Sequence, residues 1–237
     1  MKVSVLLISY NGDRFIQSQI ESILNEISDE DELIISDDGS ADNTIGIIQS
    51  FSQKHPNVKL VAGPHQGIAS NFSNAFHHCD GDLIFFSDQD DEWLPGKVSS
   101  VKEYFGAHPE DRVVMHNAYV CNGNNEIVGE DENIFHLRSA GHGVFKNIIK
   151  STYYGCCMAF RREFLEKYMP LPPEAIAYDQ LLGLFAEKER CAGFIPEKYL
   201  KHRIHGSNQS QEQPMLKKIR FRWALAAQYL KYKNGNQ

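Results

Sequence analysis

Four acidic residues gather directly after an apolar segment of the sequence. The run "LIFFSDQDDEW" at 83–93 places Asp88, Asp90, Asp91 and Glu92 within five positions. Carboxylates held this close raise one another's pKa unless a cation or hydrogen-bond donors balance them. Mg²⁺ and Mn²⁺ prefer hard oxygen ligands and are commonly held by one or two carboxylates together with phosphate oxygens. The Asp-x-Asp spacing therefore favours a divalent-cation site that also receives the phosphates of a nucleotide.

Other interpretations of this acidic loop are weaker. Aspartates also begin helices, so a solvated turn that caps the next helix stays open. An EF-hand calcium loop is excluded because Trp93 stands at its sixth position, where glycine belongs, and Ser99 at its twelfth, where a bidentate glutamate belongs. An aspartyl-phosphate enzyme also uses Asp-x-Asp, but the hydroxyl residue expected after it is missing.

The elements that position this loop alternate along the first hundred residues. Strand-like apolar segments lie at 3–9, 32–38, 58–63 and 82–88, and helical patterns at 15–27, 45–51, 68–77 and 95–105. This alternation predicts an α/β fold, a Rossmann-like and mostly parallel sheet with helices on both faces. Ligands of such sheets bind beyond the carboxyl ends of the strands, which brings Asp37 and Asp38 within reach of the acidic loop.

From about residue 107 the alternation fades. We expect strands at "RVVMHNAYVC" and "YGCCMAF", a short strand near "KYLKHRIH" and a helix over 178–189. The absence of a linker-like run predicts one domain over 1–213, with a nucleotide-binding half (1–106) and an acceptor-binding half (107–213). A basic amphipathic helix is expected over 214–237.

Composition narrows the class of protein. The 237 residues are 42% hydrophobic and carry a formal charge of -7, which argues against a general nucleic-acid binder. The apolar start at 3–8 is too short for a secretory segment, and no run approaches the roughly 18 apolar residues of a membrane span. Five cysteines without CxxC spacing favour a reducing, cytoplasmic setting.

Four motifs in register carry a resemblance to a known family. "VSVLLISYNG", "IISDDGSADNT", "GIASNF" and "IFFSDQDDEWLPGKV" resemble the family 2 inverting glycosyltransferases of the GT-A fold, particularly bacterial rhamnosyltransferase-like members. The resemblance is specific from residue 3 to about 100 and looser to about 210. It implies inverting transfer of a sugar from a nucleoside diphosphate donor, dTDP-rhamnose or a UDP-hexose, to a saccharide acceptor in surface polysaccharide synthesis, with Mg²⁺ or Mn²⁺.

The resemblance assigns the donor to positions in four loops, namely Ser9, Tyr10, Asn11, Asp38, Gly67, Asn71 and Asp88. In such enzymes the Asp38 carboxylate accepts a hydrogen bond from the pyrimidine ring. Gly67 and Asn71 flank the base, and Asp88 faces the ribose and donor sugar. From the residues alone, Asp37 and Asp38 are also compatible with an Asx turn that caps a helix.

The same resemblance places the metal. Asp90 ligates the cation that bridges the diphosphate, and Asp91 is either a ligand or a supporting partner because the doubled aspartate leaves the register open. In "HRIHGSN", His205 matches a histidine that joins the metal or the diphosphate, with His202 and Arg203 as further candidates. A lone histidine is equally compatible with a structural role.

An inverting transfer needs a base opposite the leaving diphosphate. In "AIAYDQLLGLFA" the resemblance assigns this base to Asp179, with Tyr178 in place of the usual glutamate; the alternative is an aspartate that only favours the helix start. In "YYGCCMAF", Gly155 matches a glycine that lets backbone approach a sugar, and the alternative is a plain buried strand.

The tail combines apolar and basic residues. Leu216, Ile219 and Trp223 recur at helical spacing among six Lys or Arg residues between 217 and 233. Such a helix suits an anionic membrane surface that presents lipid-linked saccharide acceptors, or it packs on the core with a solvated basic face. Rival functions are a sugar nucleotidyltransferase, although "SYNGDRF" lacks its Gly-rich basic loop, and a non-catalytic nucleotide-sugar-binding module.

Overall fold

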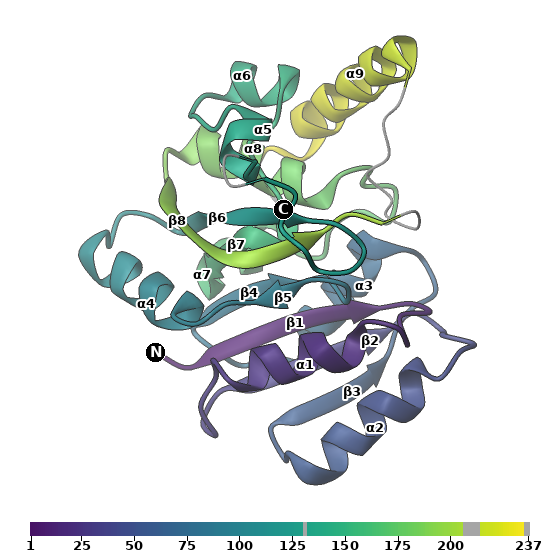
Figure 1. Cartoon of the computed structure of the whole chain (residues 1–237). Helices are drawn as coiled ribbons and strands as arrows, with labels where there is room; N and C mark the ends of the chain where they lie inside the picture. The colour runs from purple at the N-terminus through teal and green to yellow at the C-terminus, as the bar shows by residue number, and fades with distance from the viewer. Residues whose placement is uncertain (130–131, 206–213, 235–237) are drawn as a thin grey trace.

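The computed structural model describes residues 1–129, 132–205 and 214–234 (Figure 1). Within these residues eight strands form one sheet in the order β3-β2-β1-β4-β7-β6-β8-β5. Their bounds are β1 (Val3–Ser9), β2 (Glu32–Asp37), β3 (Val58–Ala62), β4 (Leu83–Ser87), β5 (Glu92–Trp93), β6 (Val113–Cys121), β7 (Met158–Arg161) and β8 (Ala192–Arg203). The predicted α/β class is confirmed.

The first half is a parallel sheet. β1 pairs parallel with β2 and with β4, and β2 pairs parallel with β3. β1, β2 and β4 are buried along their whole length because helices cover both faces, and this explains their continuous apolar runs. Right-handed crossovers place α1 (Ile16–Leu24) and α2 (Thr44–Lys54) on one face, while α3 (Ile68–His77) returns across the other (Figure 1).

The strand order reverses between β1 and β4, and the carboxyl ends of strands at such a reversal are where ligands of α/β sheets bind. The loops after β1, β2 and β4 meet at this edge. The sheet topology therefore brings the predicted donor-binding loops and the acidic loop together.

The second half is mixed. β7 pairs antiparallel with β4 and β6, β6 pairs parallel with β8, and the short β5 pairs antiparallel with β8. The expected strand at "YGCCMAF" begins only at Met158, because Gly155–Cys157 forms a 3₁₀ turn, η1. The short strand expected near "KYLKHRIH" is the end of a twelve-residue β8, which gains its length by pairing on both sides.

The helices of this half cover the sheet and the site. They are α4 (Lys97–Ala107), α5 (Ile134–Arg138), α6 (Val144–Ile149), α7 (Arg162–Tyr168), α8 (Tyr178–Glu189) and α9 (Met215–Tyr232). Sequence periodicity missed α5, α6 and α7 because elements of five to seven residues are too short to show a helical repeat. Among the described helices none is long and apolar enough to cross a membrane.

The C-terminal helix α9 packs against α8 and α6 at the top of the molecule in Figure 1. Leu225 is the buried residue of α9, whereas Trp223, Leu216 and Ile219 are 75%, 75% and 49% exposed. Phe221, Tyr229 and Tyr232 also pack against the core, so the helix rests on the domain along one face and presents apolar and basic side chains outward on the other. The Gly-Ser-Asn segment after His205 lies outside the described residues.

Candidate active site

The first aspartate of the second loop is structural. Asp37 is buried at the end of β2, and its carboxylate accepts hydrogen bonds from the Ser9 hydroxyl at 2.7 Å, the Gly39 N–H at 3.1 Å and both donors of Ser40 at 2.7 and 2.8 Å. This is the Asx-turn role left open for Asp37. Ser9, predicted to face the nucleoside, is itself buried and helps hold that turn.

The second aspartate organises the third loop. The Asp38 carboxylate accepts from the backbone N–H of His65 at 2.7 Å and of Gly67 at 3.1 Å, while its own N–H donates to the Ser9 carbonyl. His65 then lies over Gly39, where an added Cβ would approach its ring to within 2.2 Å. Each carboxylate oxygen retains a lone pair, so Asp38 can still accept from a ligand.

The first loop is tied to both of its neighbours. Tyr10 is 59% exposed, and its backbone N–H and carbonyl bond to the side-chain amide of Gln89 at 2.9 and 3.0 Å. Asn11, at φ 48°, bonds to the Ser40 hydroxyl and the Ala41 N–H, both at 2.8 Å. Tyr10 thus offers an open aromatic face at a rigid position, and Gln89, a linking residue, carries no signal in the sequence that marks it as part of the site.

Gly67 and Asn71 lie at the start of α3. Gly67 precedes the helix at φ 86°, a conformation that favours glycine. Asn71 is buried and donates to the Ser36 carbonyl at 2.9 Å, and its Oδ1 is a buried acceptor for which the described residues provide no donor. Asn71 therefore anchors α3 to the end of β2, and its predicted position beside the base stays a prediction.

The acidic loop concentrates negative charge on partly buried residues. Burial, together with the neighbouring Asp91 and Asp90, raises the pKa of Asp88 well above its ordinary value. Burial and Asp91 likewise raise the pKa of Asp90. Asp179 contributes to the shift at Asp88, so the predicted base interacts electrostatically with the acidic loop. The structure therefore brings these predicted carboxylates to one place.

Asp90 and His205 form a pair at the open side of the loop. The Asp90 Oδ2 lies 2.8 Å from His205 Nε2, and the two side chains are 16% and 12% exposed. The imidazole stacks on the Phe15 ring at 4.8 Å, and the guanidinium of Arg203 lies 4.8 Å over the same ring. These contacts fix an oxygen and a nitrogen donor side by side, so the two predicted ligands converge.

Asp91 lies behind this pair in a fully buried cluster. Its Oδ1 contacts His202 Nδ1 at 2.9 Å and accepts from the Arg203 N–H at 3.2 Å, whereas Oδ2 is buried with no partner among the described residues. Asp91, Cys156 and His202 place possible ligand atoms within 4.8 Å of one another. His202 Nδ1 is already bonded to Asp91, and this bond would have to break to admit a metal.

Charge within this cluster is balanced. Burial acts to lower the pKa of His202, but Asp91 outweighs it and sets the pKa at about 9. Burial acts to raise the pKa of Asp91, but His202 holds it below its ordinary value. At neutral pH the two form a buried ion pair that orients the end of β8, and hence His205 three residues further on.

A second cation is buried behind the site. Lys97, at the start of α4, is fully buried, with its Nζ 3.8 Å over the Trp93 ring. Its ammonium donates to the Cys156 carbonyl at 3.0 Å, within the 3₁₀ turn η1. Burial lowers the pKa of Lys97 to about 8. Lys97 could not be predicted as part of the site from the sequence, because a lysine at a helix start ordinarily faces solvent.

The predicted base is held by the same turn. Asp179 Oδ2 accepts from the Gly155 N–H at 3.3 Å, and Oδ1 accepts from the Gln180 N–H at 2.8 Å. Burial raises the pKa of Asp179, and Arg138 acts against that rise. A Cβ at Gly155 would lie 2.0 Å from the Tyr178 hydroxyl. Gly155 is therefore required for close packing of this turn against α8.

Tyr178 stands where the resemblance expected a glutamate. Its ring packs against Phe72 at 4.6 Å and Phe86 at 5.9 Å, so it joins the aromatic core of the first half. A charged carboxylate in that position would lose this packing. The departure from the family pattern thus has a packing reason and leaves Asp179 as the carboxylate at the start of α8.

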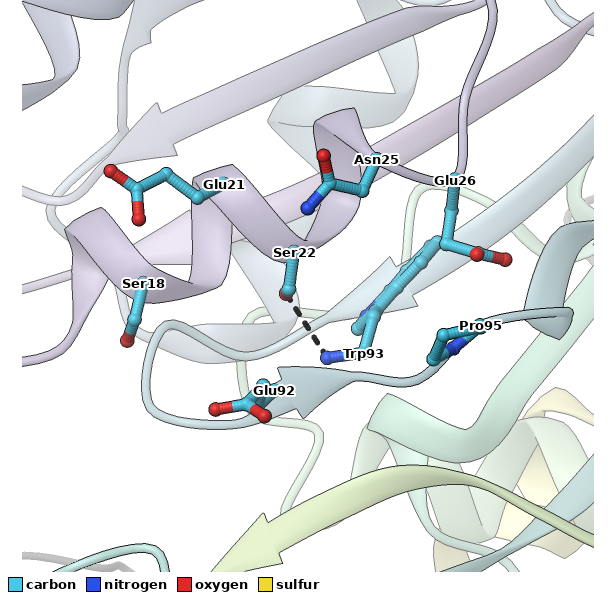
Figure 2. A pocket seen from close by; sticks show the side chains of 8 residues that line it. All are labelled: Ser18, Glu21, Ser22, Asn25, Glu26, Glu92, Trp93 and Pro95. Carbon is cyan, nitrogen blue, oxygen red and sulfur yellow. Dashed lines mark hydrogen bonds between the residues drawn. The ribbon is translucent and has the colours of Figure 1, made fainter.

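A separate hollow lies beside the site. It has a volume of about 290 Å³ and is lined by Ser18, Glu21, Ser22, Asn25, Glu26, Glu92, Trp93 and Pro95. Figure 2 shows the Trp93 N–H donating to the Ser22 hydroxyl at 3.0 Å between β5 and α1. None of the predicted site residues lines it, so we do not assign the donor to this hollow.

The sheet order and the acidic loops at its edge fit the GT-A fold of glycosyltransferases. The chain matches the model of glycosyl transferase family 2 over residues 4–169. It therefore belongs to this family.

Two relatives illustrate the relationship. An uncharacterized glycosyltransferase of Nostoc is 30% identical over 73% of this chain and 55% of its own length. The dTDP-rhamnosyl transferase RfbG of Shigella flexneri is 26% identical over 85% of this chain and 72% of its own. The chain thus spans about half the length of the Nostoc relative.

Solved structures confirm the fold. S. aureus TarS 1-349 in complex with UDP-GlcNAc has a TM-score of 0.74 at 18% identity, over 100% of this chain and 68% of its own. The mannosyltransferase PcManGT of Pyrobaculum calidifontis, in complex with GDP-Man and Mn²⁺, has a TM-score of 0.67 at 21% identity, over 97% and 63%. At these identities the likeness concerns the fold alone, and it confirms the predicted GT-A type.

Proposed function

We propose that this protein transfers a sugar from a nucleoside diphosphate donor to a saccharide acceptor with inversion, in the synthesis of a surface polysaccharide. The observation that carries the proposal is the position of Asp179 at the start of α8, where its carboxylate is partly buried and accepts from the Gly155 N–H at 3.3 Å, and where its charge contributes to the raised pKa of Asp88. A single displacement needs a base on one side of the sugar and the leaving diphosphate on the other, and Asp179 is the carboxylate proposed for that base.

On the acceptor side of the reaction, Asp179 takes the proton of the attacking hydroxyl. The acceptor hydroxyl oxygen forms a bond to the anomeric carbon, its proton passes to Asp179, and the bond between that carbon and the diphosphate oxygen breaks with its electron pair leaving on the diphosphate. Because burial raises the pKa of Asp179, the carboxylate is a stronger base than an ordinary aspartate. One displacement on one face inverts the anomeric configuration.

Asp90 and His205 fit a divalent cation on the donor side. They present one oxygen and one nitrogen atom 2.8 Å apart, in a hydrogen bond that a cation would replace, and burial and the neighbouring carboxylates disfavour the charged forms of Asp88 and Asp90, a cost that a cation would offset. In this proposal Asp90 and His205 are the ligands, while Asp91 supports them through His202. Bound Mg²⁺ or Mn²⁺ would act as a Lewis acid toward the departing diphosphate.

The proposal defines the donor only by class. Tyr10 offers a stacking surface and Asp38 an acceptor for a pyrimidine base, which suits a uridine or thymidine donor. The Shigella relative is described as a dTDP-rhamnosyl transferase, and the TarS structure contains UDP-GlcNAc. We therefore propose dTDP-rhamnose or a UDP-hexose. A thermal-shift series across nucleoside diphosphates with Mn²⁺ should give the largest stabilisation for UDP or dTDP.

Two variants test the assignment of roles. Asp179→Asn should abolish most transfer while nucleotide binding stays near wild type, and Asp90→Ala should weaken both Mn²⁺ and nucleoside diphosphate binding. Near wild-type turnover by Asp179→Asn would refute Asp179 as the base. The released product distinguishes this proposal from the two alternative functions. A glycosyltransferase releases nucleoside diphosphate, and a non-catalytic binding module releases none. A nucleotidyltransferase instead forms pyrophosphate from a nucleoside triphosphate and a sugar phosphate.

We further propose that α9 contacts the inner face of an anionic membrane, where a lipid-linked saccharide acceptor would be presented. The outward apolar side chains of Trp223 and Ile219, next to Lys217 and Lys218, support this. Flotation with anionic liposomes should be reduced in the full chain carrying Trp223→Ala and Ile219→Ala. Equal flotation of variant and wild type would reject the contact.

A further inference from the structure

Two arginines from different helices flank the residues that hold Asp179. Arg138 ends α5, and its guanidinium lies 4.3 Å over the ring of Tyr154, the residue before Gly155. Arg222 projects from α9, and its Nη1 donates to Gln180 Oε1 at 2.6 Å, on the residue after Asp179. Both guanidiniums are therefore held next to residues that adjoin the candidate base.

Among the described residues, neither Arg138 nor Arg222 forms an ion pair. Across the described ranges, no carboxylate lies within 4.0 Å of Arg138 or Arg222. Burial and the neighbouring Arg138 lower the pKa of Arg222, while Asp179 acts in the opposite direction. Arg138 and Arg222 are partly buried and repel each other, and Asp179 is the carboxylate near them. The three groups together carry net positive charge, which an anionic ligand would neutralise.

The position indicates which substrate supplies the anion. In an in-line displacement the donor's diphosphate departs on the side away from the base, toward Asp90 and His205. An anion held beside Gln180 and Tyr154 consequently belongs to the molecule that brings the attacking hydroxyl. The Tyr154 ring covers one face of the Arg138 guanidinium and its hydroxyl takes one N–H, so the remaining N–H groups are left to bind the ligand.

The number of donors indicates the kind of anion. Each guanidinium presents N–H groups in a planar fork that can hold two oxygens. A carboxylate has two oxygens and fills one fork, whereas a phosphoryl group has three strong acceptor oxygens and carries more charge. We propose that Arg138 and Arg222 form a subsite for a phosphoryl group of the acceptor, adjacent to the hydroxyl that Asp179 deprotonates. This inference rests on the proposed glycosyl transfer.

The test uses the full chain saturated with Mg²⁺ and with the nucleoside diphosphate that stabilises it most, so that the donor side is occupied. Inorganic phosphate and, separately, glucuronate are titrated calorimetrically into wild type, Arg138→Gln, Arg222→Gln and the control Arg220→Gln. The control loses the same charge from an exposed position on α9. Arg138→Lys and Arg222→Lys keep the positive charge but remove the planar set of guanidinium N–H groups. These two variants replace a glutamine variant that fails to fold.

We expect wild type and Arg220→Gln to bind phosphate equally, each glutamine variant at least tenfold more weakly, and the lysine variants in between. Nucleoside diphosphate binding should be unchanged in all of them. No phosphate binding by the wild type, equal binding by the glutamine variants, or tighter binding of glucuronate than of phosphate would overturn the subsite alone. Failure of the wild type to bind any nucleoside diphosphate would instead overturn the proposed function.

Discussion

The buried Lys97 allows a stability prediction with a defined sign. Its pKa is about 8 in the fold against 10.5 for an ordinary lysine, because burial disfavours its charged form. A shift of this size corresponds to about 3 kcal/mol by which the charged form destabilises the fold at pH 7. Lys97→Met removes that charge and also the donor to the buried Cys156 carbonyl, whose loss costs about 1–3 kcal/mol. The variant should therefore be as stable as wild type at pH 7, or up to about 2 kcal/mol more stable.

The pH dependence of the difference is the sharper quantity. Between pH 8 and 10.5 the unfolded chain holds the Lys97 proton more firmly than the fold does, so wild-type stability rises with pH relative to the variant. From pH 7 to pH 10 the stability of Lys97→Met relative to wild type should fall by about 2.5 kcal/mol. Other titrating groups are shared by both proteins and cancel in the difference.

Urea unfolding followed by circular dichroism at pH 7, 8, 9 and 10, in the presence of a chelator, measures this difference. The matched control is Lys102→Met, on the same helix with a side chain 34% exposed, and it should not reproduce the change. A free-energy difference for Lys97→Met that stays constant across this range would refute the argument. Donor turnover should fall on the order of tenfold despite retained stability, since η1 positions the base.

Three further predictions follow from the turn and the buried cluster. Gly155→Ala should destabilise the fold by about 1–3 kcal/mol in thermal unfolding, because the new Cβ meets the Tyr178 hydroxyl, and retained stability would contradict this packing. The rate of donor hydrolysis should fall as pH drops through the raised pKa of Asp179. Because Arg138 lowers that pKa, Arg138→Gln should move the decline to higher pH; the same pH profile in variant and wild type would show that Arg138 does not act on Asp179. Asp91→Asn should destabilise the fold by about 1–3 kcal/mol in urea unfolding, because burial then drives His202 to its neutral form and the hydrogen bonds of the Asp91 carboxylate are lost; a loss below about 1 kcal/mol would show that the pair is dispensable.

Much of the first half could be predicted from the sequence because its signals are local. The continuous apolar runs of β1, β2 and β4 follow from burial on both faces, and the helical stripes of α1 and α3 from burial on one. The second half was harder to predict. Its short helices lack a full repeat, and the "YGCCMAF" segment divides into a 3₁₀ turn and a strand because of contacts with α8.

By itself, the sequence determined which residues could do chemistry here: the carboxylates of two strand-end loops, a histidine after the last strand and an aspartate at a helix start. Residue type and the position relative to strand ends are enough for that, since parallel strands end at a common edge. Only the tertiary structure decided how the roles divide. The carboxylates of Asp37 and Asp91 form hydrogen bonds inside the protein, and Asp90 bonds to His205, which lies 115 residues further along the chain. Lys97 and Arg138 join the site through contacts with residues distant in sequence. Charge balance and burial depend on every neighbour in space, and no local pattern encodes them.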